Sequence, residues 1–204
     1  GGNQVGGVSL SFVRAKAPLT LPSPGTGSGT VAAPTSASTT ATCPPTCTVT
    51  YPYAQSVSIS ATAATGSRFV GWGGACTGTG SCALTMSGNR SATATFAAVV
   101  SRTITLLGPS SARKGAIISL SGTLASANTA SCSVSGQTVS LYTSATSTTP
   151  VATTTTGTGG TYAFSRKLAG TTTFVVRVTE VLPATLGNPI CAAATASLAV
   201  TATR

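Results

Sequence analysis

Side chains that could carry chemistry are few in this chain of 204 residues. The sequence contains six cysteines, no histidine and a single carboxylic side chain, that of Glu180. General acid–base catalysis usually needs a histidine or a pair of carboxyl groups, and a hard-cation site needs several carboxylate oxygens. A Ser-His-Asp triad and a Cys-His pair cannot be built. The composition therefore predicts a protein that is not an enzyme, holds no cofactor, and binds, adheres or builds.

The spacing of the cysteines predicts disulfides rather than a metal centre. An even number of cysteines in a chain of low charge indicates an oxidising compartment. The sequence offers a C-x3-C pair, a C-x5-C pair and two isolated cysteines, so the simplest pairing is Cys43–Cys47, Cys76–Cys82 and Cys132–Cys191. A zinc site built from the first four cysteines stays open as the alternative, although neither spacing is the common C-x2-C.

The formal charge of +10 arises because acidic residues are nearly absent, not because basic residues are abundant, since only 6% of the residues are charged. The 11 lysines and arginines are scattered along the sequence in runs no longer than two. They are not interleaved with the aromatic residues on which single-stranded nucleic acids stack. We expect no specific nucleic-acid site, with a functional polyanion-binding surface as the open alternative. No apolar run is long enough to predict a membrane span.

The secondary structure predicted around these residues consists of strands. Threonine and valine favour strands, while 23 glycines and 11 prolines punctuate the chain at short intervals. No long stretch repeats its apolar residues with a helical period of 3.6. The fold class predicted is therefore all-β, built from many short strands.

A short apolar strand is predicted near the N-terminus. Val8, Leu10 and Phe12 alternate with serines, as in a half-buried strand, and the residues from Ala17 to Gly29 are rich in Pro, Gly and Ser, as in a linker. Residues 1–28 are therefore predicted to be a tethered strand and its linker. This strand could fold back onto its own molecule or insert into the sheet of a neighbouring subunit, and the sequence leaves both outcomes open.

Residues 29–98 carry a specific family resemblance. The segments 66–82, 84–86 and 89–96, which read GSRFVGWGGACTGTGSC, LTM and NRSATATF, resemble the divergent internalin-type B repeat, and residues 29–31 with the first cysteine pair fit its opening. The resemblance implies a small β-grasp-like module of bacterial surface and secreted proteins, with two local disulfides and an extended architecture of repeats. It implies no catalytic residues.

The aromatic residues of this module have two interpretations. Trp72 lies among glycines and could stack against a sugar ring, and Tyr51 and Tyr53 could do the same on either side of Pro52. In the repeat, however, the tryptophan follows the Phe-Val of a strand, and a domain of this size has little else that is large to bury. We expect core positions, with a glycan platform as the alternative.

Residues 99–204 are predicted to form a sandwich. Seven strand-like segments follow one another with turn residues between them, at 103–107, 116–124, 137–143, 151–156, 161–168, 171–179 and 193–201. The passages 136–142, 152–164 and 173–178 resemble bacterial Ig-like domains, and residues 99–101 read as a very short junction. In surface Ig-like domains a buried acid can promote an isopeptide bond. Glu180 with Lys114 or Lys167 could do so, or it could lie on the surface at the end of the sixth strand.

Together these features predict a non-catalytic extracellular protein of bacterial type, a surface stalk or a filament subunit that self-associates. The alternative is a carbohydrate-binding accessory region that contacts a cell-surface glycan. Two Ser/Thr-rich tracts, 32–42 and 143–158, could be O-glycosylated or could simply fill exposed strand faces, and Asn89 stands in the single N-glycosylation sequon.

Overall fold

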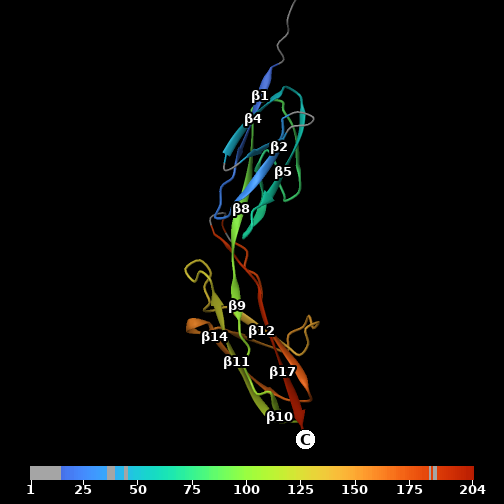
Figure 1. Cartoon of the computed structure of the whole chain (residues 1–204), viewed down its shortest axis with the longest axis vertical. Helices are drawn as coiled ribbons and strands as arrows, with labels where there is room; N and C mark the ends of the chain where they lie inside the picture. Colours follow the sequence, from blue (N-terminus) through green and yellow to red (C-terminus); the bar gives the residue numbers. More distant parts are fainter. Residues whose placement is uncertain (1–14, 36–39, 44–45, 184, 186–187) are drawn as a thin grey trace, which may run out of the picture. The chain divides into compact units, whose positions relative to one another are not determined.

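The computed structural model describes residues 15–35, 40–43, 46–183, 185 and 188–204, which form two compact units (Figure 1). Among these, unit 1 takes residues up to 24, 28–64 and 69–96, and unit 2 takes residues 25–27, 65–68 and 97–204. The regular structure of this part of the chain is all strand apart from the three-residue 3-10 helix Thr158–Gly160. The predicted all-β class is confirmed, and the N-terminal strand with Val8, Leu10 and Phe12 lies outside the described residues.

Unit 1 is built from two sheets that share one apolar core. Its strands are β1 Lys16–Pro22, β2 Gly29–Pro34, β3 Thr40–Cys43, β4 Thr46–Pro52, β5 Ser56–Ala63, β6 Ser67–Gly74, β7 Cys82–Thr85 and β8 Arg90–Val100. Residues 67 and 68 of β6 and 97–100 of β8 belong to unit 2. One sheet joins β8, β1 and β4, with β6 paired to β8, and the other has the order β3-β2-β5-β7. Within residues 29–98, alternating apolar residues predict short strands at 57–62, 68–72, 82–86 and 91–96, and these correspond to β5 to β8.

The segment expected to be a linker contains a core strand of unit 1. Ala17, Leu19 and Leu21 are at most 2% exposed, and β1 pairs with β4 along its whole length. Its other side pairs with β8 at Leu19 and Thr20. The linker interpretation was wrong because Pro18 and Pro22 masked an alternating apolar face, and a proline can lie in a strand wherever its missing N–H is not needed.

The short junction expected at residues 99–101 is also mostly strand. β8 continues to Val100, and Val99 and Val100 pair with Ile190 and Cys191 of β16 in unit 2. The chain passes from unit 1 to unit 2 between Phe96 and Ala97, inside β8. Phe96 is 1% exposed and lies against Gly29, where a Cβ atom would stand 2.3 Å from the ring. Only glycine therefore fits at the start of β2.

Unit 2 has two sheets that enclose one apolar core. Its strands are β9 Arg102–Ile104, β10 Ser111–Arg113, β11 Ile117–Ser126, β12 Thr138–Tyr142, β13 Ala152–Thr155, β14 Thr161–Lys167, β15 Thr172–Val178, β16 Ile190–Cys191 and β17 Ala194–Thr203. The sheets have the orders β10-β17-β15-β12-β13 and β14-β11-β9. Leu120, Leu141, Val176 and Val200 are fully buried between them. An Ig-like sandwich requires such a pair of sheets, and the Ig-like assignment itself stays a prediction.

Candidate functional site

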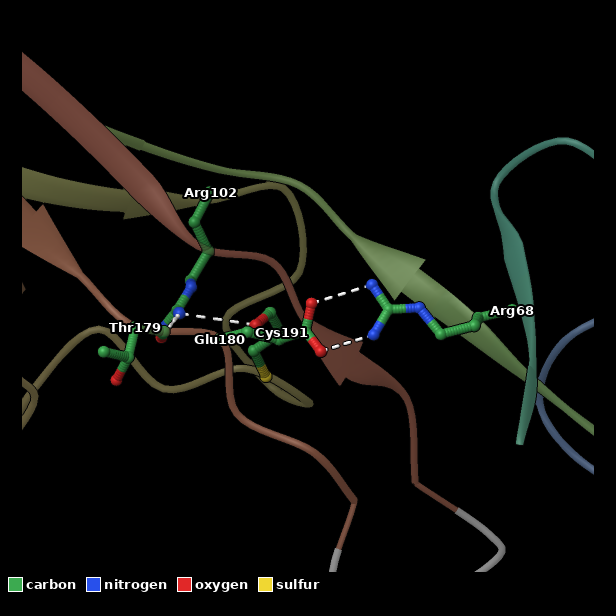
Figure 2. Close-up of polar contacts among 5 residues, drawn as sticks. All are labelled: Arg68, Arg102, Thr179, Glu180 and Cys191. Carbon is green, nitrogen blue, oxygen red and sulfur yellow. Dashed lines mark hydrogen bonds and ion pairs between the residues drawn. The ribbon is translucent and has the colours of Figure 1, made fainter. Parts of the chain in front are cut away.

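The only carboxylic side chain of the protein is held by an arginine from a distant part of the chain. Glu180 follows the end of β15, Arg68 belongs to β6, and both residues lie in unit 2. The two guanidinium Nη atoms of Arg68 donate to the two carboxylate oxygens, with Nη2 2.7 Å from Oε2 (Figure 2). The pair is partly exposed, with 48% of the Arg68 side chain and 30% of the Glu180 side chain accessible.

This pairing fixes the charge of Glu180. The hydrogen bonds from Arg68 lower the pKa of the Glu180 carboxyl group, and the same bonds raise the pKa of Arg68. A general acid at neutral pH needs a raised pKa. Glu180 therefore stays ionised and bound to Arg68 and does not act as a proton donor. It does not promote an isopeptide bond either, because that role needs a buried acid beside a lysine, whereas Glu180 is partly exposed and bound to Arg68.

Arg102 is the buried polar centre next to this pair. It is the first residue of β9, it is 5% exposed, and burial lowers its pKa. Its guanidinium donates to the carbonyl oxygens of Ala192 at 2.6 Å, Thr179 at 2.5 Å and Cys191 at 3.3 Å, and to Oε1 of Gln137 at 3.3 Å. Figure 2 shows Arg102 directed at Thr179 and Cys191. One side chain thereby holds the end of β15, the start of β12 and the residues before β17.

The six cysteines form three disulfides in the pairing that their spacing favoured. Cys43 is bonded to Cys47, Cys76 to Cys82 and Cys132 to Cys191. The third disulfide adjoins the Arg102 contacts, because the carbonyl oxygen of Cys191 accepts from that guanidinium. In the described part of the chain no three Cys, His, Asp or Glu side chains gather to hold a metal ion. Disulfide sulfurs are not thiolates and offer zinc no ligand of the usual kind, which argues against the zinc alternative.

The structure separates the three aromatic residues that were candidates for a glycan platform. Trp72 is 7% exposed, contacts Phe69 edge to face at 5.2 Å between ring centroids, and donates from Nε1 to the carbonyl oxygen of Gly80. Tyr51 is 1% exposed. A sugar cannot stack on a buried ring, so both residues belong to the core. Tyr53 is 54% exposed and remains available as a platform.

A hollow of about 630 Å³ adjoins the Glu180 cluster in unit 2, and its two charged side chains already have partners. Its wall includes Ala145, Val175, Arg177 and Glu180. Arg177 lies over the ring of Tyr142 and donates to the carbonyl oxygens of Ala145 and Ser147, while Glu180 is bound to Arg68. The arrangement pins the loop after β12 to the sheet and leaves no free charged group on these two residues for a ligand.

Sequence reasoning missed Arg68 and Arg102 as important residues. A usable signal exists for Arg102, because Arg102-Thr103-Ile104 alternates as a strand and places the arginine on the same inward face as Ile104. A charged residue at an inward position is rarely buried without partners. No such signal marks Arg68, whose partner is 112 residues away.

Comparison with known proteins gives one family. Residues 23–100 match the model of the divergent InlB B-repeat domain, which supports the resemblance predicted for residues 29–98. This extracellular type of domain and the three disulfides fit a secreted or surface protein. The described residues contain no helix with the length and apolarity needed to cross a membrane.

Other comparisons add little. No curated protein matches the chain. Among solved structures, the sulfur carrier protein SoxY from Chlorobium limicola f thiosulfatophilum is 19% identical and covers 50% of this chain and 79% of its own. Its TM-score is 0.33, so this likeness supports no conclusion about fold or function.

Proposed function

We propose that the protein is a non-catalytic extracellular structural protein, a surface stalk or the subunit of a fibre. One observation supports the proposal: the side chains of this protein that could take part in catalysis or binding instead stabilise the fold. The six cysteines form disulfides, the one carboxylate is bound to Arg68, and the one tryptophan is in the core. An enzyme keeps such groups free in a cleft and tunes their pKa values toward their task.

The proposal extends to assembly by strand donation. The predicted strand with Val8, Leu10 and Phe12 is separated from β1 by only two residues after Val13. A hairpin with β1 is disfavoured, because β1 is already paired with β4 along its whole length and with β8 at two residues. Because the segment expected to be a linker contains the paired strand β1, the predicted N-terminal strand has little free chain with which to fold back. This favours its insertion into a second copy.

Unit 2 offers an edge that could receive such a strand. β14 pairs with β11 on one side and ends the order β14-β11-β9 of its sheet. An edge strand presents unpaired N–H and C=O groups that template a further strand. A strand that joins each copy to the next forms a heterologous contact that does not close, and such contacts build fibres.

Electron microscopy and sedimentation velocity of the full chain test this proposal. We expect filaments or a ladder of oligomers that disappear on deletion of residues 1–14 and in the double variant Leu10→Asp with Phe12→Asp. The matched control is Ser9→Asp with Ser11→Asp, which adds the same charge to the polar face and should preserve assembly. Assembly that survives both the deletion and the apolar-face variant would contradict strand donation, and a chain that stays monomeric at all concentrations would contradict a fibre.

A second candidate function is carbohydrate binding at Tyr53. The exposed ring lines a hollow of about 610 Å³ in unit 1 together with Pro52 and Gln55, so a flat surface and an amide lie side by side. Binding to glycans that is lost in Tyr53→Ala and kept in Tyr142→Phe would support it. No glycan binding by the unmodified chain would remove it.

A further inference from the structure

Basic residues that are scattered in the sequence converge at one end of unit 2. Arg113 ends β10, Lys114 follows it, and Arg166 and Lys167 end β14. We call these four residues the basic pole. Arg204 follows Thr203, the cross-strand partner of Arg113. Figure 1 places the C-terminal end of β17 beside β10 at this end of the unit.

Backbone contacts bring the turn that carries Arg113 and Lys114 to the end of β14, where Arg166 and Lys167 lie. The Lys114 amide donates to the carbonyl oxygen of Thr203 at 2.9 Å, and the Gly115 amide donates to the carbonyl oxygen of Leu168 at 2.7 Å. The Lys167 side chain passes over the same turn, with its Cε 3.9 Å from where a Cβ atom would stand at Gly115. The turn at residues 113–116 thus joins the end of β14 to the end of β17.

No carboxylic side chain is free to pair with the basic pole, because the single one, that of Glu180, is bound to Arg68. Arg113, Lys114 and Lys167 are exposed and Arg166 is half-buried. Within the described residues none of the four has an ion pair, and the one ion pair there is Arg68 with Glu180. Glu180 follows the end of β15 that is paired with the start of β17, whereas the basic pole lies at the end of β17. A ten-residue strand spans about 33 Å, which is several times the screening length at physiological salt.

We propose that the basic pole binds an acidic polysaccharide of the extracellular space. The proposal rests on the proposed extracellular function, which determines the polyanions that the protein meets. Four unneutralised cations on strand ends and one turn match a polymer with repeated carboxylate or sulfate groups, because several weak contacts add up along one chain. The partner must supply the negative charge, since the only carboxylic side chain of this protein is already bound to Arg68.

Other partners fit the basic pole less well. A second copy of this chain would bring like charges to the interface, which opposes association. A single-stranded nucleic acid needs exposed rings for stacking, and the aromatic residues of β14, Tyr162 and Phe164, are buried. An anionic membrane could use Ile117, which is 75% exposed and lies opposite Lys167 on β11. One exposed apolar side chain buries too little surface for stable insertion, so we favour the polysaccharide.

Binding of the full chain to immobilised polygalacturonate and heparin tests the proposal, with neutral dextran as the blank. We expect binding to both acidic polymers that weakens as NaCl is raised. The pole variant Arg113→Gln with Lys167→Gln should weaken binding about tenfold and lower the slope of log affinity against log salt by about two. The matched control, Lys16→Gln with Arg90→Gln, removes one lysine and one arginine from unit 1 and should change affinity less than twofold.

Each alternative result overturns the proposal. Equal losses in the two double variants would show that net charge alone drives binding. Strong binding to vesicles of anionic phospholipid that Ile117→Ser abolishes, with weak binding to the polymers, would make a bilayer the partner. Tighter binding to duplex DNA than to either polysaccharide at physiological salt would make nucleic acid the partner. Assembly is measured separately by microscopy, so loss of polysaccharide binding with filaments intact leaves the proposed function standing.

Discussion

The two units of the protein are stabilised by different means. In unit 1 both disulfides are local, with sequence separations of 4 and 6, and three of their four cysteines are buried among small core residues such as Ala33, Ala92 and Ala94. In unit 2 the buried core residues are valine or larger apart from Ala194, and its disulfide spans 59 residues. Unit 2 also buries Arg102 among backbone carbonyl groups.

The difference shows how sequence distance changes the value of a crosslink. In the chain-entropy model, loops as short as those of unit 1 stabilise by about 2 kcal/mol each, and a loop of the length found in unit 2 stabilises by about 4 kcal/mol. Unit 1 is therefore crosslinked by two local restraints that each stabilise it modestly. Unit 2 depends on a few long-range restraints that meet at Cys191 and Arg102.

The largest effect should come from removing the long-range disulfide. The variant Cys132→Ala with Cys191→Ala should lower the free energy of unfolding of unit 2 by about 4 kcal/mol, whereas Cys43→Ala with Cys47→Ala should cost unit 1 about 2 kcal/mol. Urea titration followed by amide NMR signals of unit 2 and by fluorescence of Trp72, the only tryptophan, separates the units. A larger loss from the short loop than from the long one would break the comparison.

The next effect should come from Arg102. Replacement by Met keeps much of the side-chain volume but leaves the carbonyl groups of Thr179 and Ala192 without their buried donor, so we expect a loss of about 3 kcal/mol. Arg102→Lys should recover part of it, because one ammonium group cannot reach all four acceptors. Arg113→Met is the exposed control, expected to change stability by less than about 0.5 kcal/mol. Similar thermal midpoints for the Arg102 and Arg113 variants would contradict a stabilising role for the buried hydrogen bonds of Arg102.

A pair of buried tyrosines compares the units at a smaller scale. The Tyr162 hydroxyl donates to the carbonyl oxygen of Thr105, and burial raises its pKa to about 12. The Tyr51 hydroxyl is buried in unit 1 with no hydrogen-bond partner in the described part of the chain. Tyr162→Phe should therefore cost unit 2 about 1 kcal/mol, and Tyr51→Phe should leave unit 1 as stable or slightly more stable. Chemical denaturation of both variants checks this, and a greater loss from Tyr51→Phe would refute it.

The smallest effect concerns the exposed ion pair. The pKa of Glu180 is lowered in the folded state, so its contribution to stability is complete above the pKa of the unfolded chain and is lost as pH falls through the folded pKa. Glu180→Gln should slightly lower the thermal midpoint of unit 2 at neutral pH and match the unmodified protein in strong acid. A difference between the two thermal midpoints that grows toward low pH would contradict this prediction.

Local patterns allowed much of the fold to be predicted. Alternation identified the strands from β5 to β8 and the main strands of unit 2, and cysteine spacing gave the disulfide pairing. β1 was missed because prolines at 18, 22 and 24 and nearby glycines have a linker composition, although Ala17, Leu19 and Leu21 alternate. The composition of a segment does not determine whether it forms a strand, because that depends on the strands available to pair with it.

The polar cluster and the basic pole could not be predicted in the same way. Arg68 and Glu180 meet across 112 residues, and the pole joins β10, β14 and the end of β17. The basic residues are indeed scattered along the chain, but strand register in unit 2 brings four of them to one end. Such proximity depends on the topology of the whole unit, which no local pattern records.

The proposed structural function requires that the reactive side chains hold the fold together and that none is free for catalysis. Counting thiols by mass spectrometry tests it most directly, with an alkylating reagent applied to the unfolded protein before and after reduction. We expect no labelled cysteine before reduction and six labelled cysteines after it, in protein purified without added oxidant. A stoichiometric label before reduction, or zinc released on unfolding, would contradict the claim and reopen both a catalytic and a metal-binding function.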